Sequence, residues 1–267
     1  MAFAKVLVPV DGSPLSDVAT EVAIRFATRF GSQLTFLNVV DFSSNSTYGR
    51  IENVDEILDL QVEGQKATDR VTEKAKAAGI SFEAKIVQGI PWEVIVNLSK
   101  SYDHIILGVT GKGGIGGRIG ETVKKVLENS WCPVLTIKSG TRSIEEILLP
   151  VANVNEAAIR VATETVKKIG CKLTIFVVRA EGIDEYPLIE QVAAECREQG
   201  IDVDTKIGEG NPAEAIAAQS GMYDLVIMGT MSKCEGNVLH DGVTQSVILN
   251  SACPVTVVRA VCKDCWH

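Results

Sequence analysis

The sequence predicts an α/β fold built twice, as two tandem, doubly wound domains. Each domain is expected to hold a five-stranded, mostly parallel sheet with helices on both faces. Two observations carry this prediction: the chain repeats its own pattern, and short apolar runs alternate with longer amphipathic stretches inside each copy. Such alternation produces parallel strands joined by right-handed helical crossovers. The 267 residues accommodate two domains of about 130 residues each.

The repeat is carried by short segments that recur in the same order. From Gly89 onward the two copies are offset by 121 residues, whereas Gly31 and Gly170 are offset by 139. The difference of 18 residues indicates an insertion in the first copy, which we place within residues 41–62. The small, polar stretch 139–143 is typical of a linker, so the predicted domains are 1–140 and 141–267. The matching pairs include VLVPV (6–10) with ILLPV (147–151), GIP (89–91) with GNP (210–212), and CPV (132–134) with CPV (253–255).

In the first copy, the strands are expected to be apolar throughout, because helices would cover both faces of a parallel sheet. The helices are expected where apolar residues recur at helical spacing with polar residues between them. The predicted strands are 5–10, 34–40, 82–87, 104–108 and 133–138, and the predicted helices are 14–30, 55–78, 91–100 and 120–129.

Ligands of such sheets bind at the carboxyl ends of the strands, where the strand order reverses. The first strand ends at residues 11–14 (DGSP), and the fourth ends at residues 108–111 (GVTG). If these two strands are neighbours, both loops face one crevice.

The loop after the fourth strand is rich in glycine, with seven glycines among residues 108–123. Glycines allow several backbone N–H groups to converge on one phosphate. A helix expected from Gly120 would add its positive N-terminal end, and Lys112 and Arg118 add positive charge. A flexible loop without function is the alternative. The loop lacks the Gly-Lys-Ser/Thr sequence of a Walker A motif.

Together these segments resemble the universal stress protein family in its tandem two-domain form. The resemblance covers essentially the whole chain and implies the strand order 3-2-1-4-5 and a homodimer. The residues that carry it are VPVDGS (8–13), VVD (39–41), GIP (89–91), Asp103, the glycine loop, and CPVL (132–135).

The resemblance also implies an adenine-nucleotide site in the first copy. Nucleotide-binding members carry Gly-x2-Gly-x9-Gly-Ser/Thr. Here Gly108 and Gly111 fit, but eight residues separate Gly111 from Gly120, and Glu121 stands in place of Ser/Thr. A carboxylate there would repel a triphosphate, which leaves AMP, ADP or no nucleotide as alternatives. The residues implied to bind are Val10 and Val39 at the adenine, Asp11 near the nucleoside, and Gly108, Gly111, Gly120 and Thr122 at the ribose and phosphates.

Asp11 has a second interpretation, as a turn former or helix N-cap ahead of Pro14. In the second copy Ala152-Asn153 replaces Asp11-Gly12, and the loop 229–242 keeps only three glycines and adds two acidic residues. We therefore expect the second site to be degenerate and this copy to act as a packing partner.

Composition narrows the function classes. A net charge of −8 argues against a nucleic-acid partner. No stretch approaches 18 apolar residues, so no membrane span is expected, and the first residues show no secretion signal. The seven cysteines are expected to be mostly buried thiols of a cytoplasmic protein.

The C-terminal tail offers Cys262, Cys265 and His267 as weak candidates for zinc ligands. A structural site needs four ligands, so Cys234 with His240, or a second chain, would have to complete it. A frayed terminus is the favoured interpretation, and zinc is not expected. His104 begins a buried strand and is expected to be structural.

The predicted function is a cytosolic stress-response or regulatory protein that binds ATP or AMP in its first domain, with or without magnesium. The alternative is a nucleotide-independent dimerisation or interaction module. We find no general base and expect no enzyme, although weak ATP hydrolysis stays open.

Overall fold

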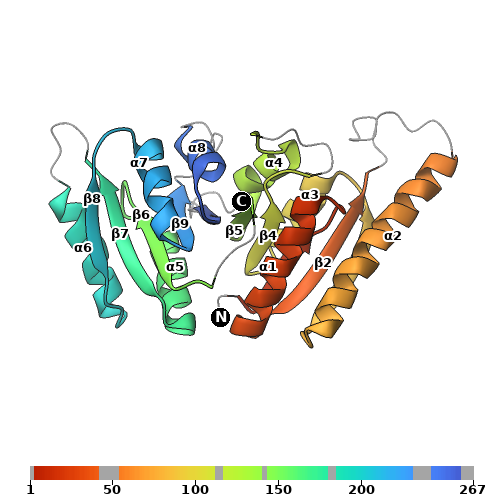
Figure 1. Cartoon of the computed structure of the whole chain (residues 1–267), viewed down its shortest axis with the longest axis horizontal. Coiled ribbons are helices and arrows are strands. Elements are labelled where there is room, and N and C mark those ends of the chain that lie inside the picture. Colours follow the sequence, from red (N-terminus) through yellow and green to blue (C-terminus); the bar gives the residue numbers. More distant parts are fainter. Residues whose placement is uncertain are drawn as a thin grey trace, which may run out of the picture. The chain divides into compact units, whose positions relative to one another are not determined.

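The computed structural model describes residues 3–41, 54–111, 117–139, 143–179, 185–230 and 242–259. It divides into two compact units, a first unit of residues Phe3–Gly140 and a second unit of Thr141–His267. Strands and helices alternate along both (Figure 1). Among the described residues, no helix combines the length and apolar character needed to cross a bilayer.

The first unit has its strands in the spatial order β3-β2-β1-β4-β5, and each adjacent pair is parallel. The predicted order is thus confirmed, and the order reverses between β1 and β4. Its elements are β1 (Lys5–Pro9), α1 (Pro14–Phe30), β2 (Gln33–Val40), α2 (Val54–Ala77), β3 (Phe82–Gln88), α3 (Pro91–Ser99), β4 (His104–Gly108), α4 (Glu121–Asn129) and β5 (Val134–Ile137).

Helices of the first unit pack in two pairs, α1 with α2 and α3 with α4. The chain runs from β1 towards β3 in one direction and from β4 to β5 in the other. Right-handed crossovers therefore place the two helix pairs on opposite faces of the sheet. Both α1 and α3 begin with proline, whose fixed φ suits the first helical turn.

The second unit repeats this topology in the order β8-β7-β6-β9-β10, again with parallel neighbours. Its helices also pack in pairs, α5 with α6 and α7 with α8. Its elements are β6 (Glu146–Pro150), α5 (Glu156–Ile169), β7 (Lys172–Val178), α6 (Tyr186–Glu198), β8 (Asp204–Gly208), α7 (Pro212–Gln219), a 3₁₀ turn (Ser220–Met222), β9 (Leu225–Thr230), α8 (Val243–Asn250) and β10 (Val255–Arg259).

Helix α2 agrees with the predicted helix 55–78 to within one residue at each end. It has 24 residues and its counterpart α6 has 13, so part of the extra length of the first copy lies in α2. One feature differs between expectation and structure. Strand β3 is not the continuous buried run that we expected, because most of its residues are exposed. It is one of the two outer strands of the unit and carries Glu83 and Lys85, charges that protect a sheet edge from pairing with other chains.

His104, the first residue of β4, is buried and has a structural role, as expected. This imidazole is 2% exposed and stacks on Phe3, with ring centroids 4.1 Å apart. Burial lowers the pKa of His104 to about 3, so the ring is neutral at physiological pH.

Cys132, Cys171 and Cys196 are buried and form no disulfide, as expected. Burial raises the pKa of Cys132 to about 12, which keeps that thiol protonated and unreactive. Among the described residues, no cluster of His, Cys, Asp and Glu could hold a metal ion. The tail candidates Cys262, Cys265 and His267, and also Cys234 and His240, lie outside the described residues.

Candidate functional site

A cavity of about 360 Å³ lies in the first unit at the carboxyl ends of β1, β2 and β4. This is where the strand order reverses, the place at which ligands bind to sheets of this type. The structure brings all the residues implied by the resemblance into the lining of this one cavity. They are Val10, Asp11, Val39, Gly108, Gly111, Gly120 and Thr122.

The turn of residues Asp11–Ser13 forms one wall and depends on its own side chains. Gly12 adopts a φ of 76°, a left-handed conformation that glycine tolerates without strain. The Ser13 amide donates to Oδ1 of Asp11 at 2.9 Å, which closes the turn. Ser13 then caps α1, because its Oγ accepts from the amide of Ser16 at 3.2 Å. Asp11 is therefore both a turn former and a cavity residue, whereas the N-cap is Ser13.

Close neighbours explain two glycines at the end of β4, Gly108 as its last residue and Gly111 in the loop that follows. A Cβ on Gly108 would lie 3.0 Å from the backbone carbon of Leu15, so glycine lets α1 pack tightly against β4. A Cβ on Gly111 would collide with Oδ2 of Asp11. The ends of β1 and β4 are thus in contact at this point, and the Asp11 carboxylate lies between them.

The N-terminus of α4 supplies the third wall. Gly120 is the N-cap, makes no side-chain capping bond, and donates its amide to the carbonyl of Val109 at 2.9 Å. The following residues, Glu121 to Val123, also line the cavity. Backbone N–H groups at a helix start are an anion-binding arrangement. Residues 112–116, which include Lys112, lie outside the described residues.

The Glu121 side chain lies mostly in solvent at the edge of the cavity. This side chain is 73% exposed and lies 3.9 Å from Nζ of Lys125, one turn along α4. An exposed carboxylate beside the cavity acts on a ligand through solvent, where salt screens the interaction. Its effect on an anion is therefore expected to be modest.

We expect Glu121→Gln to raise the affinity for ATP by about two- to threefold at low ionic strength, and to raise that for AMP less. ATP carries more negative charge than AMP, so removal of the Glu121 charge should improve ATP binding more. Titration calorimetry in low and high salt measures both effects. Glu93→Gln, which removes an exposed carboxylate outside the cavity lining, serves as the control. A gain that persists in high salt would show that charge is not its cause.

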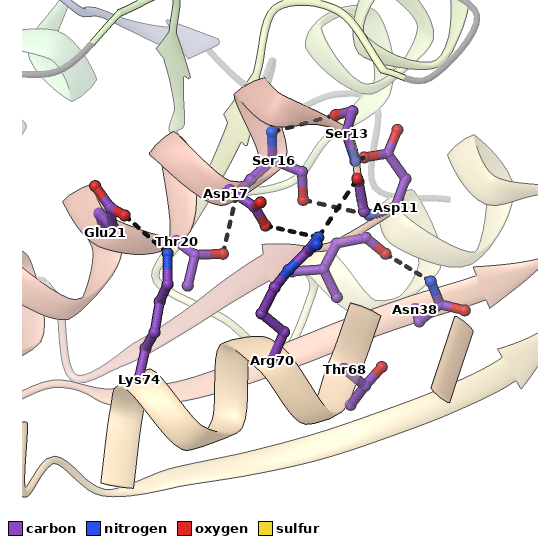
Figure 2. A network of polar contacts seen from close by, with 12 residues as sticks. Asp11, Ser13, Ser16, Asp17, Thr20, Glu21, Asn38, Thr68, Arg70 and Lys74 are labelled. Atoms are coloured by element: carbon purple, nitrogen blue, oxygen red, sulfur yellow. Dashed lines mark hydrogen bonds and ion pairs between the residues drawn. The ribbon is translucent and has the colours of Figure 1, made fainter. Parts of the chain in front are cut away.

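Sequence reasoning placed Val39 of β2 at the site, but it missed Asn38 beside it and the contribution of α2. Asn38 is 6% exposed, lines the cavity, and donates its Nδ2 to the carbonyl of Val10 at 2.7 Å (Figure 2). Gly64 in α2 packs against the Asn38 amide, and a Cβ there would collide with it. Leu60 and Glu63 line the cavity beside Gly64. A glycine inside a 24-residue helix was the available indication of such close approach.

The charges on the described lining have one sign. Asp11, Asp41, Glu63 and Glu121 contribute carboxyl groups, whereas no Lys or Arg occurs among the described lining residues. The negative electrostatic potential of this lining favours neutral or weakly charged groups, or anions that carry a compensating cation.

The corresponding place in the second unit is built differently. Asn155 caps α5 by accepting from the amide of Ala158 at 3.0 Å, and its Nδ2 reaches the carbonyl of Thr230 at 3.5 Å. A Cβ on Gly229 would collide with this side chain. Asn155 therefore occupies space between α5 and the end of β9. Residues 231–241, the rest of the second loop, lie outside the described residues.

Known proteins share both the sequence and the fold. Residues 2–138 and 177–259 match the model of the universal stress protein family. A universal stress protein of Methanocaldococcus jannaschii is 32% identical over 142 residues, which cover 51% of this chain and 82% of the relative. One of Mycobacterium bovis is 24% identical and aligns over 95% of this chain and 96% of its own.

A solved universal stress protein from Archaeoglobus fulgidus has the same fold over 97% of both chains, with a TM-score of 0.80 and 24% identity. The family model covers most of both units, and the tandem arrangement extends through the relatives that match over the full length. The chain therefore belongs to the universal stress protein family, in its tandem two-domain form.

Proposed function

We propose that this protein is a cytoplasmic stress-response or regulatory protein that binds an adenine nucleotide, AMP or ATP, in its first unit. One observation carries the proposal. The residues that the family resemblance implies come from the ends of β1, β2 and β4 and from the start of α4, and they all line one cavity. The described cysteines form no disulfide, which fits the reducing cytoplasm.

The shape and chemistry of the cavity support a nucleoside with a short phosphate chain. A volume of about 360 Å³ lies within the range of small-molecule sites. Val10 and Val39 offer apolar surface for a base, and Asp11 offers a carboxylate acceptor for hydroxyl or amino groups. The α4 N-terminus offers N–H donors to a phosphate.

The carboxylates on the lining lead to an expected ligand order. AMP is expected to bind at least as tightly as ATP when magnesium is absent, and magnesium is expected to improve ATP more than AMP, because it neutralises phosphate charge. We propose binding without catalysis. A nucleotide would then shift the populations of conformations or assemblies, including a homodimer, to which it binds differently.

Thermal unfolding with and without AMP or ATP tests the proposal. At a hundredfold excess over the dissociation constant, a ligand that binds only the folded state stabilises it by about 2.7 kcal/mol. Asp11→Ala and Gly111→Val are expected to abolish the shift. Asp202→Ala is the matched control, because Asp202 also accepts a neighbouring backbone amide, at 3.1 Å, but lies in the second unit. No shift with millimolar nucleotide would refute the proposal.

The acidic lining supports a second candidate, a nucleotide-independent dimerisation or interaction module. It predicts that native mass spectra of gently purified protein show no bound nucleotide. It also predicts an oligomeric state that does not respond to ATP. A bound nucleotide that disappears in the Gly111→Val variant would decide against this candidate.

A further inference from the structure

We infer that Arg70 is a positioning residue that holds the turn Asp11–Ser13 in its ligand-facing form by tying it to helix α2. The expected effect of Arg70 on nucleotide affinity rests on the proposed function. Arg70 itself is not among the lining residues of the cavity.

The contact pattern of Arg70 supports this role. Its Nη2 lies 3.0 Å from Oδ1 of Asp17 and donates to the carbonyl of Gly12 at 3.4 Å (Figure 2). One guanidinium nitrogen thus joins the first turn of α1 to the residue between Asp11 and Ser13. A single cation that contacts both groups restricts how far the turn can move from α2.

Helix α2 holds the same segment from a second point. Gly64 packs against Asn38, whose Nδ2 donates to the carbonyl of Val10 at 2.7 Å. The carbonyls before and after Asp11 are therefore both held, one through Asn38 and one by Arg70. Because α2 also contributes Leu60 and Glu63 to the lining, these contacts set the spacing between opposite walls of the cavity.

The second unit differs at the positions of both Arg70 and Asp11. The offset of 121 residues places Gln191 at the position of Arg70, and Ala152 stands at the position of Asp11. The same helix pair instead brings Glu195 near Glu156, and burial followed by the Glu156 charge raises the pKa of Glu195. The arginine thus occurs in the copy that has the acidic turn.

The chain supplies a matched control one turn further along both helices. Lys74 of α2 pairs with Glu21 of α1 at 2.8 Å. This ion pair joins the same two helices, although Glu21 is 54% exposed and Asp17 is 28% exposed, and no contact between Lys74 and the Asp11–Ser13 turn occurs among the described residues. Arg70→Ala and Lys74→Ala each remove one α1–α2 ion pair, and only the first removes the contact with Gly12.

The experiment compares these two variants by calorimetry with AMP and by ¹⁵N relaxation of the nucleotide-free protein. Arg70→Ala is expected to weaken AMP binding by about three- to tenfold, within the range for positions that do not touch the ligand. It should also lower the order parameters of Gly12 and Ser13 from about 0.85 towards 0.6. Lys74→Ala is expected to change affinity by less than about twofold and to leave both order parameters unchanged.

Equal order parameters in the two variants would overturn the inference, and so would equal losses of affinity. If the wild-type protein binds no nucleotide, the proposed function fails, and relaxation of Gly12 and Ser13 alone decides whether Arg70 positions the turn. Arg70→Lys, which keeps a cation for Asp17, should lie between wild type and Arg70→Ala in both measurements.

Discussion

Acidification from pH 6 to pH 4 is expected to destabilise the wild-type protein by roughly 2–3 kcal/mol more than a His104→Leu variant. Burial lowers the pKa of His104 from 6.5 to about 3 in the folded protein. Below pH 6.5 the unfolded chain therefore takes up a proton that the folded state does not bind. Each pH unit in this window costs about 1.4 kcal/mol per such proton.

The direction of the change in stability with pH follows from the lowered pKa of His104 in the folded protein. The contribution of neutral His104 to stability is complete above pH 6.5, is lost as the pH falls, and changes no further below about pH 3. Urea unfolding of both proteins between pH 4 and 7.5 measures the difference, because titrating carboxylates affect both alike. Parallel pH profiles would show that the imidazole titrates in the folded state and that its environment is wetter than the structure indicates.

Gly108→Ala is expected to destabilise the first unit by about 1–3 kcal/mol, the usual cost of overpacking a tight contact. The added methyl group would lie 2.9 Å from the Cβ of Leu15 and 3.0–3.1 Å from its backbone carbon and oxygen. Backbone atoms of α1 cannot rotate away as a flexible side chain can, so the helix would have to move off β4. Chemical denaturation measures the loss.

Gly120→Ala provides the comparison for this prediction. Its Cβ would meet no atom closer than 3.6 Å, an ordinary van der Waals distance, and its φ of −62° suits any residue. We expect a loss below about 1 kcal/mol, which is the moderate cost of alanine at an N-cap position and not a packing cost. Equal losses for both variants would mean that the α1–β4 contact is looser than described.

The elements of the first unit were predictable because apolar periodicity and end signals agree. Ser13 and Pro14 mark the start of α1, and Gly31 with φ 72° ends it, as its capping role requires. The burial of strand β3 was mispredicted, because an outer strand needs only one neighbouring strand and one covered face. No local pattern reports which strand lies at an edge.

Those residues of the candidate site that come directly after a strand could be predicted from the sequence. The residues after β1 and β4 are fixed by topology, so Asp11 and Gly111 could be placed together from the sequence. Asn38, Glu63 and Arg70 could not, because their roles depend on how α2 lies across β2. Spacing along a helix predicts a face, but not which loop that face meets.

A ¹H–¹⁵N correlation spectrum of the full chain, titrated with AMP and with magnesium-ATP, tests the nucleotide site of the first unit most directly. We expect saturable shifts at Val10, Asp11, Gly111 and Thr122. The amides of Val151, Ala152 and Gly229 in the second unit should stay unchanged. An absence of shifts at millimolar nucleotide, or equal shifts in the second unit, would contradict a nucleotide site confined to the first unit.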